Sequence, residues 1–160
     1  MRVTQTNAQA TPPARAEWVE LDCVDDVRVG DVATPQQITI EGADRLRAAM
    51  QSALGDIGDI EVPMGIADVC PDPLVFALQA GLPRLTNFAQ TIDGGSAWCD
   101  REPIGCEPLY AVSEIAQIAA RTTSDGRRLV RVDYRTRFTN PSGVLVGTAT
   151  GSSIHVGSVE

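Results

Sequence analysis

The feature that most constrains the fold is an alternation of side chains between positions 130 and 138. One set suits a buried face: Val130, Val132, Tyr134, Thr136 and Phe138. The residues between them are charged: Arg131, Asp133, Arg135 and Arg137. A period of two places the two sets on opposite faces of a β-strand. The pattern therefore predicts a strand over 127–139, in an antiparallel sheet with one buried face and one solvent-exposed face.

Turn signals on both sides extend this strand into a meander. Ser124-Asp125-Gly126 is a strong hairpin signal, and Asn140-Pro141-Ser142-Gly143 predicts a second turn. Long strands are therefore expected over 109–122 and 144–156. Upstream, the same reasoning predicts a turn at 29–32 and short strands over 18–21, 37–40, 86–92 and 96–100.

Two helices are predicted before the meander. Apolar residues recur at helical spacing over 41–54, and Gly55 stands where a helix C-cap belongs. The segment 74–80 is nearly all apolar, and Asp72 and Pro73 suit the start of a helix there. A helix that is apolar on every side should be buried. We therefore expect this second helix at the centre of the fold.

This order of elements predicts an α+β protein in which an antiparallel sheet curves around a central helix. A chain of 160 residues fits one domain with a hydrophobic core. Residues 1–16 are polar and rich in Thr, Gln and Pro, which predicts a disordered or extended arm. The expected organisation is an arm over 1–16 and one domain over 17–160.

Composition excludes several classes of function. A net charge of -8 argues against nucleic acids and anionic membranes as partners. All basic residues are Arg, so lysine Schiff-base and pyridoxal phosphate chemistry are excluded. The four cysteines, Cys23, Cys70, Cys99 and Cys106, form no zinc-binding pattern, and we expect no cofactor. Without a secretory signal or an apolar span, we expect a cytoplasmic protein with free, mostly buried thiols.

The stretch Gly55-Asp56-Ile57-Gly58-Asp59-Ile60-Glu61, followed by Ala67, resembles the signature of the MaoC-like (R)-specific enoyl thioester hydratases and dehydratases. That signature runs Gly-Asp-x-Asn-Pro-aliphatic-His, then five residues, then Ala or Ser. Gly58 and Asp59 replace its Asn and Pro, and Glu61 replaces its His. The resemblance implies a hydratase frame that has lost one of its two catalytic groups.

The downstream sequence resembles the second half of the same family in three places. These are Asp93-Gly94-Gly95-Ser96-Ala97-Trp98, Glu102-Pro103-Ile104 and Thr139-Asn140-Pro141-Ser142-Gly143. With the motif, the resemblance covers roughly residues 28 to 157. It implies a single hotdog fold, which normally pairs into dimers at a sheet edge.

Three interpretations of Asp56 and Glu61 remain open. In the family, an Asp and a His act on one water and one α-proton, as an acid and a base must in this reaction. The two carboxylates are therefore a relic in a subunit that shapes the acyl tunnel beside a catalytic partner, or they act themselves as acid and base. The third interpretation is a surface loop with acidic residues by chance.

Other candidate site residues follow the motif. Asp93 is a candidate carboxylate in a thioesterase, and Gly94-Gly95 predicts a tight turn or a close approach of backbone to a ligand. Phe76 and Trp98 are candidates for lining an acyl tunnel, although core packing explains Trp98 equally well. His155 is the only histidine, and its position in the last strand favours a structural role. Four arginines are candidates for contacting coenzyme phosphates, although exposed charges that keep the protein in solution are the favoured interpretation: Arg84, Arg101, Arg127 and Arg128.

The leading hypothesis is a subunit of a heteromeric (R)-specific enoyl-CoA hydratase or 3-hydroxyacyl-thioester dehydratase. Its ligand would be an acyl-CoA or acyl-carrier-protein thioester, and a second hotdog chain would supply the Asp/His dyad. Resemblance to two-chain systems of fatty-acid elongation and steroid side-chain breakdown suggests these pathways. The alternatives are a stand-alone hotdog acyl-CoA thioesterase and a non-enzymatic acyl-CoA-binding module.

Overall fold

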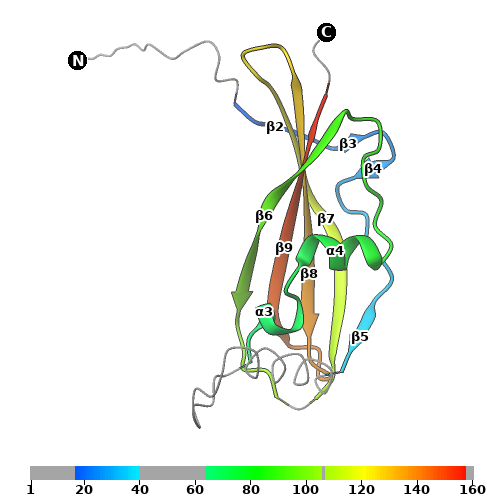
Figure 1. Cartoon of the computed structure of the whole chain (residues 1–160). Coiled ribbons are helices and arrows are strands. Elements are labelled where there is room, and N and C mark those ends of the chain that lie inside the picture. Colours follow the sequence, from blue (N-terminus) through cyan, green and yellow to red (C-terminus); the bar gives the residue numbers. More distant parts are fainter. Residues whose placement is uncertain (1–16, 40–63, 106, 158–160) are drawn as a thin grey trace, which may run out of the picture.

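The computed structural model describes residues 17–39, 64–105 and 107–157. Its main sheet has the strand order β2-β7-β8-β9-β6, and β5 also pairs with β7. The long strands are β6 (Gln90–Asp100), β7 (Leu109–Thr122), β8 (Arg128–Thr139) and β9 (Leu145–Val156). The short ones are β2 (Val19–Leu21), β5 (Gln36–Ile38) and the β3–β4 hairpin (Cys23–Val24 and Val27–Arg28). Helices α3 (Ile66–Val69) and α4 (Pro73–Gln79) pack against the long strands (Figure 1).

Strands β7, β8 and β9 confirm the predicted meander to within one residue at each end. The two turns depend on glycine, because Gly126 and Gly143 have φ angles of 85° and 84°, in the left-handed region. The alternation on β8 is also confirmed. All five residues of its uncharged set are buried, and the charged residues between them reach solvent. The antiparallel α+β layout is the one that the sequence predicts.

The sheet lets the helices approach closely through small residues on β9. Its helix-facing residues are Gly147, Ala149, Gly151 and Ser153. A Cβ atom on Gly147 would lie 2.5 Å from a side-chain carbon of Ile66 in α3. One on Gly151 would lie 2.4 Å from the backbone nitrogen of Leu74 in α4. These glycines therefore allow both helices to pack directly against the backbone of β9.

Helix α4 confirms the predicted helix, but the expectation that it is buried on every side was wrong. Its N-terminus is capped as expected, because the Asp72 carboxylate accepts a hydrogen bond from the Val75 N–H at 3.2 Å. Only Pro73 and Ala77 are fully buried, and Val75 is 44% exposed. The helix packs by one side onto β8 and β9, and its residues Val75 and Gln79 are exposed.

Strand β6 corrects the prediction of separate strands over 86–92 and 96–100. The chain enters the sheet only at Gln90 and continues without a break to Asp100. Gly94 and Gly95 form a β-bulge in which the register against β9 shifts, rather than a turn. Gly95 has a φ of 105°, and its N–H donates to the Asp93 carboxylate at 2.8 Å. The strand continues past the extra residue because glycine adopts a positive φ without steric strain.

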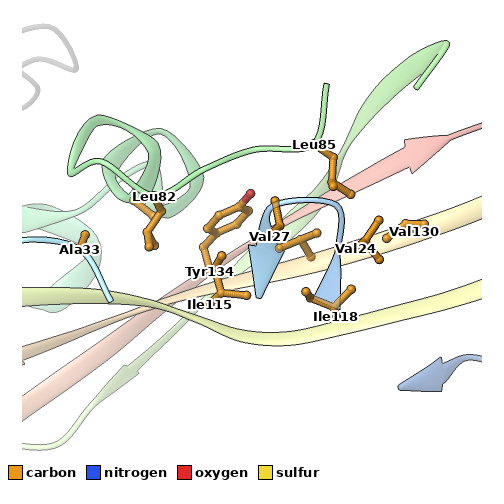
Figure 2. Packing of buried hydrophobic residues seen from close by; sticks show 11 residues of the cluster. Val24, Val27, Ala33, Leu82, Leu85, Ile115, Ile118, Val130 and Tyr134 are labelled. Atoms are coloured by element: carbon orange, nitrogen blue, oxygen red, sulfur yellow. The ribbon is translucent and has the colours of Figure 1, made fainter. Parts of the chain in front are cut away.

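The larger core cluster lies between the meander, the β3–β4 hairpin and the segment after α4. Figure 2 shows its side chains, including Val27, Leu82, Ile115 and Tyr134, gathered in one group. The Tyr134 hydroxyl donates to the Pro83 carbonyl at 2.9 Å, so the only polar atom of this buried side chain is hydrogen-bonded. Burial raises the pKa of Tyr134 to about 12, and the nearby Arg84 opposes this rise.

Several sequence expectations fall outside the described residues: the arm 1–16, the helix 41–54, and the motif residues Asp56 and Glu61. Among the described cysteines, Cys70 is buried as expected, whereas Cys23 and Cys99 are exposed because they lie on a two-residue hairpin strand and an edge strand. Within the described ranges, no helix is long and apolar enough to cross a membrane.

Candidate functional site

The candidate site is a cleft at the end of β6, directly after the segment that carries the motif. Its volume is about 370 Å³. Its lining comes from the chain before α3 and from the loop after β6: Met64, Gly65, Asp100, Arg101, Glu102 and Pro103. Met64 is the first described residue after the motif, so the chain leads from Glu61 to this cleft within three residues.

Asp100 links the end of β6 to the start of α3 beside the cleft. Its carboxylate accepts a hydrogen bond from the Ile66 N–H, at the start of α3, at 2.7 Å. The Asp68 carboxylate accepts from the Gly65 N–H at 2.8 Å. A Cβ atom on Gly65 would lie 3.2 Å from the Asp100 carboxylate, so the backbone approaches this group closely. Two N–H groups that could polarise a bound carbonyl are thus already paired with carboxylates.

The loop after β6 is tied to the sheet by its backbone. The N–H groups of Arg101 and Glu102 both donate to the Val146 carbonyl, at 2.8 Å and 3.0 Å. This anchor fixes the direction in which the chain leaves the sheet. As a result, the cleft wall carries two carboxylates, from Asp100 and Glu102, and one guanidinium, from Arg101.

Trp98 and Phe76, the two predicted tunnel residues, flank the smaller core cluster near this cleft. The Trp98 indole N–H donates to the Cys70 carbonyl at 2.8 Å, which pins the end of α3 to β6. The ring is 40% exposed. Phe76 packs against that cluster from α4, with its ring centroid 6.1 Å from that of Phe138. Burial, then the Asp72 charge, raises the pKa of the Cys70 thiol to about 12.

Asp93, Gly94 and Gly95 lie apart from this end of the strand. They form the bulge opposite Ser152 and Ser153. Asp93 pairs with Ser153, which lies six residues and about 20 Å along β9 from Gly147, the partner of Asp100. A Cβ atom on Gly94 would lie 2.9 Å from the Ser152 Cβ, so the close approach at Gly94 is to β9. The structure therefore does not bring Asp93 to the cleft.

His155 lies at the opposite end of β9. It is fully buried, and it is hydrogen-bonded to the Ser153 hydroxyl at 2.8 Å and the Thr91 hydroxyl at 3.3 Å. The Phe88 ring lies 5.5 Å away, centroid to centroid. Burial, and then the positive charge of Arg84, lowers the pKa of His155. These contacts are those of a satisfied core histidine.

The distance between His155 and the cleft follows from the register. Asp100 pairs with Gly147, and His155 lies eight residues further along β9, about 26 Å away. Of the four arginines proposed for coenzyme phosphates, only Arg101 lines the cleft. Arg127 instead contacts Asp125 at 3.2 Å within the β7–β8 hairpin. Among the described residues, neither the histidine nor an arginine cluster lies at the cleft.

Sequence reasoning missed α3 and the role of Asp100. A helix of four residues is too short to show a periodic pattern, and Asp100 meets Ile66 across 34 positions of sequence. A local signal did exist, since Asp68 follows Gly65 at the spacing of a side chain that caps a helix start. Among the described residues, no group of three or more His, Cys, Asp or Glu side chains could hold a metal.

Comparisons with known proteins bear on the fold. No family model matches the chain, and a comparison with curated proteins finds no match. Among solved structures, the (3R)-hydroxyacyl-ACP dehydratase complex HadBC from Mycobacterium tuberculosis matches with a TM-score of 0.51 and 18% identity, over 79% of this chain and 96% of that one. A monoamine oxidase regulatory protein from Archaeoglobus matches with a TM-score of 0.51 and 16% identity, over 82% and 92%.

At these identities the likeness concerns the fold. The antiparallel sheet and helix α4 packed against it agree with the expectation from the sequence. The chain therefore has the hotdog fold, as the resemblance to MaoC-like hydratases predicted.

Proposed function

We propose that this chain is a MaoC-like subunit of a heteromeric (R)-specific enoyl-CoA hydratase or 3-hydroxyacyl-thioester dehydratase. In this proposal it shapes the acyl tunnel, and a partner hotdog chain supplies the catalytic Asp and His. The carrier is coenzyme A or an acyl carrier protein, and the pathway is fatty-acid or steroid side-chain metabolism. The fold, shared with a dehydratase complex, supports the hydro-lyase class.

The observation that carries the proposal is the position of His155. It is the only histidine of the chain, and it is buried and hydrogen-bonded about 26 Å from the cleft. Glu61 stands where the family has its catalytic histidine. Because no histidine of this chain can reach the cleft without unfolding β9, the imidazole must come from another chain if the family mechanism operates.

The cleft itself supports a non-catalytic role. Hydration needs an acid and a base near the double bond, and an N–H donor for the thioester oxygen. The Ile66 N–H at the start of α3 already donates to Asp100, which takes one such donor out of use. Asp100 and Glu102 also make the described wall acidic, which disfavours the enolate-like charge of the transition state.

The test is to purify the tagged chain from its own cells and identify the companion by mass spectrometry. The lone chain, the companion and the complex are then assayed with enoyl-CoA thioesters of increasing acyl length. We expect the lone chain to be inactive and the complex to hydrate the longer substrates faster than the companion does. A complex without any hydratase activity would overturn the proposal.

Variants of the motif distinguish a relic from a working carboxylate pair. In the complex, Asp56→Asn and Glu61→Gln should each leave kcat within about twofold, because the partner holds both catalytic groups. A matched substitution of the partner's catalytic Asp should reduce kcat by about 100-fold or more, the usual size of acid–base catalysis. Loss of activity through Glu61→Gln alone would instead assign catalysis to this chain.

The stand-alone thioesterase has weaker support. Its candidate Asp93 accepts a hydrogen bond from the Gly95 N–H within the bulge and lies outside the cleft. Release of free thiol from acyl-CoA by the lone chain would nevertheless select it. Binding of acyl-CoA by the lone chain without turnover would select the binding module.

A further inference from the structure

The outer face of the sheet, on the side away from α3 and α4, carries a row of arginines. Strand β8 buries Tyr134 and Phe138 in the core clusters that also contain residues of these helices. Because successive side chains of a strand point to opposite faces, Arg131, Arg135 and Arg137 lie on the outer face. Among the described residues, both helices pack on the other face (Figure 1). The outer face of β8 is therefore a surface to which a partner could bind.

Two carboxylates are paired with this arginine row. Arg131 contacts Asp133 at 3.0 Å. Arg135 and Arg137 both contact the Glu114 carboxylate, at 2.7 Å and 3.3 Å. The side chains of Asp133 and Glu114 are 13% and 21% exposed, whereas those of the three arginines are 39% to 54% exposed. The guanidinium groups therefore reach solvent more than the carboxylates do. Three arginines and two carboxylates give a local net charge of +1, in a chain whose net charge is -8.

Apolar side chains border the arginines on the same face. Val112 pairs with Arg137, and Val32 forms a bridge with Glu114. Directly opposite residues of two strands project to the same face, so both valines lie on the outer face. Tyr110 joins them, because it lies two residues from Val112 on β7. Val32 is 60% exposed and Tyr110 is 39% exposed, so this apolar surface is open to contact.

Together these side chains form what we call the outer patch: Val32, Tyr110, Val112, Arg135 and Arg137. Tyr and Arg are enriched at protein–protein interfaces, and they are frequent among the residues that dominate the binding energy. The outer patch has an apolar side along β7 and a cationic side along β8. A matching partner needs an apolar stripe flanked by carboxylates.

We propose that the outer patch binds an acidic amphipathic helix of another protein. An α-helix is about 10 Å across and neighbouring strands are about 4.8 Å apart, so a helix lying along β7 also reaches β8. Its apolar stripe packs on Tyr110 and Val112, and its Glu or Asp side chains accept paired hydrogen bonds from Arg135 and Arg137. The stretch from Tyr110 to Glu114 is about 13 Å long, which corresponds to about nine helical residues.

Other partners match the outer patch less well. A second copy packed face to face would place Arg135 and Arg137 against their own equivalents. A nucleic acid would leave Val32 and Tyr110 without apolar contacts, and the net charge of -8 would repel it. None of the outer-patch residues lines the cleft, so this surface is separate from the proposed function.

A nuclear magnetic resonance titration of the isotope-labelled full chain tests the proposal. The probe is a helical peptide of about twelve residues, with Leu on one face and Glu on both flanks. Its control has Gln in place of every Glu. We expect the Glu peptide to shift the amide signals of residues 110–114 and 135–137, and to bind about tenfold more tightly than the Gln peptide, the size of one charge-assisted hydrogen bond. Absence of binding, shifts confined to other strands, or equal binding of both peptides would overturn the proposal.

Two arginine variants separate the outer patch from overall charge. Arg137→Gln removes a cation from the patch and should weaken binding of the Glu peptide about tenfold. Arg127→Gln removes the same charge from the β7–β8 hairpin, where Arg127 contacts Asp125, and should leave binding within about twofold because salt screens the distant charge. Both arginine side chains are about half exposed, so both variants should keep the wild-type unfolding midpoint. Equal weakening by the two variants would reduce the effect to net charge and refute a specific site.

The apolar side of the patch has its own test. Val32→Ser should weaken binding of the Glu peptide about tenfold, because burying a valine side chain contributes about 1.5 kcal/mol or more. Unchanged binding by this variant would contradict an amphipathic partner. A double-stranded oligonucleotide is the competing probe. If it binds the outer patch more tightly than the Glu peptide does, the patch recognises phosphates and the proposed helix is wrong.

Discussion

The two ends of β9 differ in what they build from the same strand. At the end near the C-terminus, His155, Ser153 and Thr91 form a closed set of hydrogen bonds beside the larger core cluster. At the other end, Gly147 and Gly151 have no side chain, so α3 and α4 can approach the backbone of β9. The polar groups of the first end are satisfied within the chain, whereas the second end borders a cleft. Among the described residues, the cleft lies at the second end, because Asp100 in its lining pairs with Gly147.

The largest expected effect is at Gly151, where β9 contacts α4. Gly151→Ala places a Cβ atom 2.4 Å from the Leu74 backbone nitrogen, which no side-chain rotation can relieve. We expect the free energy of unfolding to fall by about 3 kcal/mol or more, at the upper end for overpacked sites. Urea denaturation measures it. Gly105→Ala, whose Cβ would meet nothing within 4 Å, is the control and should stay within about 0.5 kcal/mol.

At the closed end, His155→Ala should cost about 2 to 4 kcal/mol in stability. It leaves the buried hydroxyl of Ser153 without its partner and opens a cavity next to Phe88. Because His155 lies far from the cleft, kcat of the complex per folded molecule should not change. A large loss of kcat in folded His155→Ala would contradict the purely structural role of this end of β9.

The closed end should also show a pH dependence. Burial and Arg84 lower the pKa of His155 in the folded state relative to its ordinary value of 6.5. The folded state therefore binds the proton less well than the unfolded chain, so His155 contributes stability above pH 6.5 that is lost as the pH falls through the lowered pKa. Urea midpoints of the wild type and His155→Gln, compared at pH 7.5 and pH 5, isolate this contribution. An equal pH dependence in both proteins would contradict it.

The smallest effect is expected at the start of α3. Asp100→Ala removes the acceptor of the Ile66 N–H and should cost about 1 kcal/mol, as the loss of a helix cap does. Asp100→Asn keeps an acceptor oxygen at the same place and should recover most of this loss. Thermal unfolding of both variants measures the difference. Identical midpoints for the two variants would mean that the hydrogen bond contributes little.

Much of the sheet could be predicted because its signals are local. The alternation around Tyr134 and the turns at Gly126 and Gly143 set β7, β8 and β9 almost to the residue. The prediction was wrong where the local conformation depends on pairing with a strand distant in sequence. Gly94-Gly95 permits a turn or a bulge, and the pairing of both flanks with β9 selects the bulge.

The candidate site was predicted less well than the fold. Sequence resemblance identified Trp98 and the segment around Glu102, which lie at or near the cleft. It could not identify Asp100, because the meeting of this carboxylate with α3 depends on how β6 and β9 pair. The roles of Asp56 and Glu61 stay a prediction, since both residues lie outside the described ranges.

Periodicity, turn chemistry and composition were enough to predict the antiparallel meander, the position of α4 and His155 as the single histidine. The packed sheet, in contrast, places His155 far from the cleft and makes β6 one continuous strand at the edge of the described sheet. Both depend on the register between strands far apart in sequence, and register is a property of the packed sheet as a whole.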